Sequence, residues 1–300
     1  MTTKNTIKGH AAALFSVIFW GTTFISTKIL LEDFTPFEIL MVRFTIGYLI
    51  LWIMKPSKFK DVIIYKGHEL LFAGAAITGV ITYFLLENSA LTYTSVSNVG
   101  VIVSTAPFFT ALIAHFILKN ERFRPSFFIG FLFAIAGIIL ISYNASTTLS
   151  LNPLGDIMAL GAAFIWGIYS VLTKKISDLG YNMIIATRKI FFYSLLSMVL
   201  LAVFFQPAIQ IQQLLEPVYL TNFLFLGIGA SALCYVTWNW ATKILGAVKT
   251  SIYIYIIPVI AIISSSLILN ESMTGLSIVG TLLTIAGLFL SEKPIGKSHQ

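Results

Sequence analysis

Four basic side chains lie inside long apolar segments of this chain, where an unpaired charge is costly. They are Lys28, Arg43, Arg188 and Lys189. A charged residue deep in a membrane helix costs roughly 2.5–3.5 kcal/mol on insertion scales, so it should face water, a partner or a ligand rather than lipid. Arg43 lies about eight residues into its segment, roughly 12 Å along a helix axis. Its natural partner is Glu87 in the next segment, and an ion pair and direct ligand contact fit this placement equally well.

Arg188 occupies the place that matches Arg43 in the second half of the chain. If both guanidinium groups face one cavity, they attract a carboxylate or another anion, which the planar arginine fork binds well. Lys28 lies near the end of its segment, and Lys189 must point away from its neighbour Arg188. Both lysines are therefore expected to extend toward the lipid headgroups.

Two apolar segments carry matched faces of aromatic and hydroxyl side chains at helical spacing. The faces consist of Trp20, Thr23, Phe24 and Thr27 in one segment and Trp166, Tyr169, Ser170 and Thr173 in the other. Packing is the more frequent role of an aromatic stripe, but hydroxyls in a bilayer prefer another helix or water to lipid. Lining of a cavity is therefore the second interpretation of these faces.

Four further residues are candidates for the same cavity. Asn88 and Asn239 are counterparts in the two halves, and their amides either bind a ligand or lock helices together. Trp238 stands where the first half has Glu87, so the second half has no equivalent residue that could share a role of Glu87. Tyr255 is a weaker candidate.

Two prolines stand near the middle of equivalent apolar segments, at Pro107 and Pro258. Each removes a backbone donor and predicts a kink. The carbonyl that is freed needs a new partner in lipid, and the nearby hydroxyl of Ser104 is suited to help. The paired kinks predict either gates at the ends of two helices or static bends.

Composition requires that lipid surround the elements that carry these residues. The chain has 300 residues, of which 57% are hydrophobic and 10% charged, and its mean hydropathy is +0.91. A water-soluble core cannot hold that much apolar surface. The apolar segments run near 20 residues, which predicts spanning helices rather than barrel strands. We expect ten of them, at 9–31, 35–54, 69–91, 94–118, 124–143, 155–175, 182–205, 218–242, 246–269 and 274–291.

The chain repeats itself once, which indicates an internal duplication. Phe19-Trp20-Gly21 returns as Ile165-Trp166-Gly167, and the segment from Pro107 to Glu121 returns from Pro258 to Glu271. The expected repeats are residues 1–145 and 146–300. Each holds five expected spans, an odd number, so the second repeat must lie inverted in the membrane.

The fifth and tenth expected spans carry small residues at matching positions. They are Gly130, Ala134 and Gly137 in one span and Gly280, Thr284 and Gly287 in the other. Small residues at this spacing let helices approach closely. These faces predict either a scaffold between the repeats or the contact of a homodimer.

The distribution of charge predicts an orientation. All the basic residues except the four named above lie before the first expected span or after the second, fourth, sixth, eighth and tenth, whereas Glu32, Asp33, Glu216 and Glu271 lie in the other loops. By the positive-inside rule both termini are cytoplasmic. This distribution also argues against nucleic acid as a partner, despite a net charge of +7. The lone Cys234 excludes an intramolecular disulfide and a cysteine-based metal cluster, and no cofactor or metal is expected.

Several of these features together resemble EamA-type members of the drug/metabolite transporter superfamily. They are the Trp-Gly pairs in the first and sixth expected spans, Arg43-Phe44, and the stretch from Asn88 to Ser95 that leads to Thr105-Ala106-Pro107. The resemblance covers essentially the whole chain. It implies an all-α membrane protein with ten transmembrane helices in two inverted five-helix repeats, a central cavity, and secondary transport of small metabolites or amino acids, often outward.

The leading interpretation is therefore a carrier in the cytoplasmic membrane that moves an amino acid or a related small organic metabolite by alternating access. A multidrug or cationic compound exporter is the alternative if Arg43 does not neutralise Glu87. A membrane-embedded enzyme acting on lipid-linked substrates is the third interpretation. The histidines argue against it, because they are not paired at metal-ligand spacing.

Overall fold

The structure is a computed structural model that describes residues 3–56, 67–94, 96–118, 125–145, 152–260, 263 and 275–292. Throughout these residues the regular structure is helical. Seven helical stretches in this part of the chain are long and apolar enough to cross a membrane, and three shorter apolar helices accompany them. The all-helical membrane architecture is therefore confirmed, while the count of ten spans stays a prediction.

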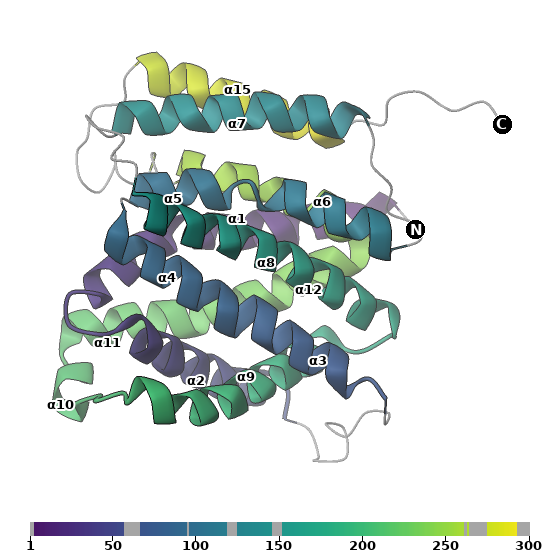
Figure 1. Ribbon diagram of the computed structural model, residues 1–300. Coiled ribbons are helices and arrows are strands. Elements are labelled where there is room, and N and C mark those ends of the chain that lie inside the picture. The colour runs from purple at the N-terminus through teal and green to yellow at the C-terminus, as the bar shows by residue number, and fades with distance from the viewer. Residues whose placement is uncertain are drawn as a thin grey trace.

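The helices of the first half lie among those of the second half in one bundle (Figure 1). They are α1 (Thr3–Leu30), α2 (Pro36–Met54), α3 (Glu69–Ala76), η2 (Ile77–Thr82), α4 (Tyr83–Tyr93), α5 (Val96–Val103), α6 (Ala106–Ile117) and α7 (Pro125–Ala145). The second half supplies the rest of the bundle. Its elements are α8 (Pro153–Asp178), α9 (Met183–Phe205), α10 (Ile211–Leu214), α11 (Pro217–Leu224), η3 (Phe225–Leu233), α12 (Cys234–Leu245), α13 (Ala247–Ser251), η4 (Ile252–Ile256) and α15 (Gly275–Glu292).

Local sequence signals set several helix starts. Thr35 caps α2 in a capping box with Glu38, and a proline follows the cap. Asn152 and Asn182 cap α8 and α9 with their side-chain oxygens, which accept from the first free backbone N–H groups. These starts lie within a few residues of those expected from the apolar pattern.

The small-residue faces of α7 and α15 meet inside the chain, where these two helices form a layer of their own (Figure 1). A Cβ added at Gly130 would lie 2.5 Å from the carbonyl oxygen of Gly287, and one at Gly137 would lie 2.5 Å from that of Gly280. The contacts are reciprocal between repeat-equivalent positions, as a twofold relation requires. The two helices run antiparallel, and the small residues form a scaffold between the repeats.

We expect Gly137→Ala to destabilise the protein by about 1–3 kcal/mol, because the added methyl group meets backbone atoms that cannot move aside. The new Cβ would lie 2.6 Å from the backbone nitrogen of Thr284. Gly100→Ala is the matched control, since among the described residues no atom outside its own helix backbone lies within 4 Å of the added Cβ. Thermal unfolding in detergent measures both variants, and equal melting temperatures would contradict the tight contact.

The fourth apolar segment is broken rather than kinked. Its helix α5 ends at Val103, a turn follows, and α6 begins at Ala106 with Pro107 in its first turn, where a proline needs no hydrogen bond. The hydroxyl of Ser104 donates to the carbonyl of Gly100 at 2.6 Å. The expected help for the carbonyl freed by the proline, that of Val103, is therefore wrong.

The equivalent ninth segment is irregular in a different way. The 3₁₀ turns of η4 precede Pro258, and residues 257–260 are α-helical. In the 3₁₀ turn the N–H of Ile257 donates to the carbonyl of Ile254, the group that Pro258 leaves free. Both predicted proline irregularities are therefore present in the described part of these two segments.

Two π-helical stretches interrupt the third and eighth apolar segments, which the sequence pattern had predicted as regular helices. They are η2 and η3, at equivalent places in the two repeats. A π-helix widens the turn and leaves backbone carbonyls for other partners. The carbonyl of Gly79 accepts from the Tyr235 hydroxyl at 2.6 Å, and that of Ala230 accepts from the Trp20 indole at 3.0 Å.

Polar contacts join the two halves at both ends of the bundle. At one end Lys189 donates to Glu69 at 2.7 Å, and the hydroxyl of Tyr193 donates to the other oxygen of this carboxylate at 2.5 Å. At the other end Tyr219 donates to Asp33. Because the side chain of Lys189 is only 4% exposed, the expectation that it extends to the headgroups is wrong. The buried ammonium is paired instead.

Candidate functional site

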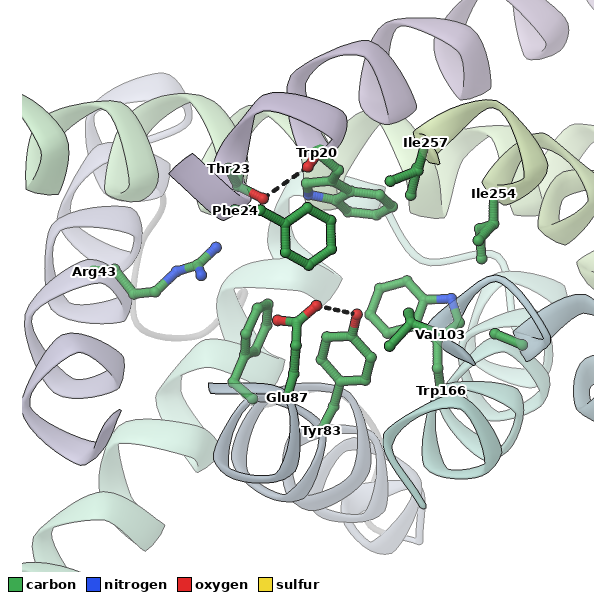
Figure 2. A pocket seen from close by; sticks show the side chains of 12 residues that line it. Trp20, Thr23, Phe24, Arg43, Tyr83, Glu87, Val103, Trp166, Ile254 and Ile257 are labelled. Carbon is green, nitrogen blue, oxygen red and sulfur yellow. Dashed lines mark hydrogen bonds between the residues drawn. The ribbon is translucent and has the colours of Figure 1, made fainter. Parts of the chain in front are cut away.

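A cavity with about 480 Å³ of empty space, a figure that includes space open to solvent, lies between segments from both halves (Figure 2). Residues from the first half form most of its wall. The lining consists of Trp20, Thr23, Phe24, Arg43, Tyr83, Phe84, Glu87, Val103, Ala106, Trp166, Ile254 and Ile257.

Arg43 extends from α2 into this cavity with its side chain almost completely buried (Figure 2). Its Nε donates to the hydroxyl of Ser231 in η3 at 3.0 Å. The guanidinium carbon lies 4.3 Å from the ring centre of Phe84, and such a cation–π contact stabilises a partly desolvated charge. Its terminal nitrogens Nη1 and Nη2 donate to no group in the described part of the chain. Two donors of a fixed fork therefore remain for a ligand.

Glu87 enters the same cavity from α4 and is 8% exposed. One carboxylate oxygen accepts from the hydroxyl of Tyr83, one helical turn earlier, at 2.8 Å. The other has no hydrogen-bond partner among the described residues. Arg43 and Glu87 do not appear among the ion pairs between described residues, so the predicted direct pair is not formed. Two opposite charges line one cavity without neutralising each other by contact.

Aromatic rings enclose the space between these charges. Trp20 and Trp166 hold equivalent positions in the two repeats and pack edge to face, with ring centres 5.3 Å apart. Trp238 packs behind Trp20 at 5.0 Å and is not part of the lining. The indole N–H of Trp166 is buried without a partner in the described structure, whereas that of Trp20 binds a backbone carbonyl. Trp166 therefore brings an unused donor to the cavity wall.

The counterparts Asn88 and Asn239 differ in their surroundings. Asn239 accepts from the hydroxyl of Tyr169 at 2.9 Å and donates to that of Thr187 at 3.1 Å, so it locks α8, α9 and α12 together. In the first half Thr23 stands where the second has Tyr169, and its hydroxyl donates to a carbonyl of its own helix. Both amide atoms of Asn88 are buried without a hydrogen-bond partner in the described part of the chain.

We expect Asn239→Ala to cost more stability than Asn88→Ala, by about 1–3 kcal/mol. The two substitutions remove the same atoms from equivalent, buried places. Only the first removes hydrogen bonds and leaves the hydroxyls of Tyr169 and Thr187 without their partner. Chemical or thermal unfolding of the two variants side by side measures the difference. Equal losses would contradict the lock.

Several residues that the sequence placed at the cavity lie elsewhere. Arg188 donates to the carbonyl of Lys55 at 2.9 Å and stacks on the ring of Trp52, away from the lining. Tyr255 packs against α15 in a separate apolar cluster. Thr27 is buried outside the lining. Each lies on a predicted helix, but on a face that the neighbouring helices cover.

Lys28 is exposed near the end of α1, where its ammonium donates to the carbonyl of Leu91 at 3.1 Å, and its extension to the headgroups stays a prediction. Pro107 and Pro258 do not line the cavity, but each directly follows a residue that does, Ala106 and Ile257.

Sequence reasoning missed part of the site. Tyr83 precedes Glu87 by four residues, a spacing that places both on one helical face and that was available as a signal. Ser231 lies in a glycine-rich apolar run and carried no signal for its contact with Arg43. Ile254 was hidden among apolar neighbours because only the fold shows which of them faces the cavity.

Comparison with known proteins places these features in a family. The EamA-like transporter family matches the chain twice, at residues 7–143 and again at residues 153–292. A solved structure titled "Crystal structure of protein" superposes with a TM-score of 0.75 over 97% of both chains. Because it is 20% identical in sequence, it shows the fold alone.

Similar proteins extend over the same length. One from Archaeoglobus fulgidus, described as an uncharacterized transporter, is 27% identical over 98% of this chain and 99% of its own. One from Salmonella typhimurium, described as a probable amino-acid metabolite efflux pump, is 23% identical over 93% of both chains. The names of these relatives are those of transporters and point away from enzymatic activity.

Proposed function

The chain belongs to the EamA-like transporter family, and from that premise we propose that it carries a small organic metabolite, an amino acid or a related compound, across the cytoplasmic membrane by alternating access. The proposed direction is export. The observation that carries the proposal is the cavity in which Arg43 and Glu87 are buried without pairing with each other. Unpaired charges at that depth are costly unless a ligand or water compensates them.

The proposed architecture is ten spans in two repeats, residues 1–145 and 146–300, inverted with respect to each other. The reciprocal contacts of α7 with α15 support it, as does the pairing of Trp20 with Trp166. Alternating access in inverted repeats proceeds by movement of one repeat against the other around a site at their interface. A homodimer is also proposed.

The proposed orientation has both termini in the cytoplasm. It is tested with Glu32→Cys and Asp178→Cys, two exposed positions that follow the first and the sixth expected spans. A membrane-impermeant thiol reagent should label the first from outside the cell and the second only after permeabilisation. Labelling of both from the same side would contradict the orientation. The native Cys234 is fully buried and serves as the unreactive background.

A second function is favoured by one observation, the free oxygen of Glu87. A cavity with an uncompensated carboxylate and five aromatic side chains also suits an organic cation, because aromatic faces attract cations. An exporter of cationic drugs would depend on Glu87 and be indifferent to Arg43. Dependence on both residues is expected of a carrier for amino acids.

Flux through purified protein in liposomes tests the proposed function. A broad panel of radiolabelled metabolites is offered with and without an imposed proton gradient, and saturable flux of at least one of them is expected. Liposomes with heat-inactivated protein are the control. The absence of saturable flux for the whole panel, under both conditions, would overturn transport as the function.

A further inference from the structure

The cavity is polar at one end and apolar at the other (Figure 2). The guanidinium of Arg43 and the carboxylate of Glu87 point into the same side of the space, near Phe24. On the opposite side the wall is formed by Val103 and Ile254. A ligand that fills the space must therefore present different chemistry at its two ends.

The polar end offers complementary contacts to two charges at once. Two terminal nitrogens of Arg43 and one oxygen of Glu87 make no hydrogen bond to the described residues. A ligand with one charge would satisfy one of these groups and leave the other buried without a partner, which costs more than a lost hydrogen bond between neutral groups. A ligand with a carboxylate and an ammonium on the same carbon atom satisfies both.

The apolar end is built from the two irregular segments. Val103 ends α5 at the break in the fourth segment, and Ile254 lies in the 3₁₀ turns of the ninth. Ala106 and Ile257 complete this wall from the residues just before the two prolines. In the described structure the indole N–H of Trp166 is the unpartnered buried donor among the aromatic residues of the lining. A charged group at this end would lack a countercharge.

We infer that the cavity binds a zwitterionic α-amino acid with an uncharged, mainly apolar side chain in one orientation. Its carboxylate contacts Arg43, its ammonium contacts Glu87, and its side chain lies against the irregular parts of the fourth and ninth segments. The inference rests on the proposed transport function and specifies the substrate class and the residues that recognise it.

Binding of three probes with the same hydrocarbon body tests the two charges. They are L-leucine, 3-methylbutylamine, which lacks the carboxylate, and 4-methylpentanoate, which lacks the amine. Thermal stabilisation of the purified protein reports binding without requiring transport. We expect leucine to bind about tenfold or more tightly than either analogue, since each analogue forfeits a hydrogen bond to a charged group. The inference fails if an analogue binds as tightly as leucine, or if leucine does not bind.

Two variants separate the roles of the charges. Arg43→Gln should weaken the binding of leucine and 4-methylpentanoate about tenfold and leave the binding of 3-methylbutylamine unchanged. Glu87→Gln should weaken the binding of leucine and 3-methylbutylamine and leave that of 4-methylpentanoate unchanged. A merely structural role would weaken the binding of all three probes in parallel and would overturn the assignment. Arg188→Gln is the matched control, because it removes a buried guanidinium outside the cavity and should not change the order of the probes.

The side-chain end has its own test. Ile254→Ala enlarges the space at the apolar end of the cavity. It should raise the affinity for the larger L-phenylalanine relative to L-leucine by about threefold or more, since each extra buried CH₂ contributes about 0.8 kcal/mol. Ile252→Ala makes the same change in the same 3₁₀ element. Ile252 lies in the separate apolar cluster with Tyr255, so this variant should leave the ratio of the two affinities unchanged. Equal ratios in both variants would overturn this orientation.

Flux measured on the same preparations distinguishes the inference from the proposed function. Saturable flux of metabolites without the zwitterion pattern would overturn the inference and leave transport intact. Selective binding of leucine without any flux would overturn transport and leave the assignment of the site standing.

Discussion

Replacing Pro107 and Pro258 together by alanine is expected to slow transport by tenfold to about a hundredfold. An interior proline disfavours a continuous helix by about 3 kcal/mol, which corresponds to roughly a hundredfold change in an equilibrium. Without the prolines the break in the fourth segment and the 3₁₀ turns in the ninth lose the residues that maintain them, and continuous α-helices become favourable in lipid. If these irregular parts are gates, one facing state becomes dominant.

Flux and accessibility measured together test this expectation. A cysteine at Thr23, which lines the cavity, is labelled with a membrane-impermeant reagent from each side, and the double variant should label from one side in preference to the other. Pro153→Ala is the matched control, because Pro153 also lies in the first turn of a helix but outside both irregular parts. Static bends would leave both labelling and flux as in the wild type.

Glu69→Gln is expected to lower the stability by about 2–3 kcal/mol, because it leaves the buried ammonium of Lys189 without its countercharge. The figure lies below the usual cost of breaking a buried pair, since Glu69 is 42% exposed and water compensates in part. The double variant Glu69→Gln, Lys189→Met should recover most of the loss. Thermal unfolding in detergent measures all three proteins.

The matched control for this pair is Asp178→Asn. Asp178 pairs with Lys174 one turn away on the surface of α8, where such pairs contribute at most about 0.5 kcal/mol. A melting temperature of Glu69→Gln equal to that of the wild type would contradict the buried pair. So would a double variant less stable than the single one. Because the pair joins α3 to α9, its loss should also increase labelling of a cysteine at Thr23 from that end.

The elements were largely predictable because lipid imposes a one-dimensional rule. A spanning segment must be apolar over about 20 residues and helical, so hydropathy alone locates it. The internal duplication also showed which segments of the two halves correspond. The faces of small residues on α7 and α15 were correctly predicted to be close-packed. The π-helical stretches were not predictable in this way, since η2 and η3 read as ordinary apolar helix.

The site was predictable only in part. Arg43 and Glu87 were expected near each other because both are charged residues in neighbouring segments, and both do line the cavity. Their direct pairing was wrong, since Arg43 binds Ser231 and Glu87 binds Tyr83. These alternatives differ by a rotation of each helix about its own axis, which leaves the hydropathy of the segment unchanged.

The repeat relation failed at the level of side chains for a similar reason. Asn88 and Asn239 are equivalent in sequence, yet only Asn239 is bonded, because Tyr169 reaches it and the shorter Thr23 in the equivalent place binds its own helix. Arg188 likewise repeats the position of Arg43 but binds the carbonyl of Lys55. Equivalent positions of the two repeats thus hold helices together by hydrogen bonds in the second half and line the cavity in the first.

The sequence by itself determined that this protein is a helical membrane protein built from a duplicated unit with a charge inside each half. Hydropathy and internal repetition are properties of the linear sequence and do not depend on how the helices pack. The tertiary structure decided which charge reaches the cavity, that Arg43 and Glu87 stay unpaired there, and that the fourth and ninth segments close its apolar end. Those outcomes depend on side-chain length and helix rotation across contacts between residues far apart in sequence.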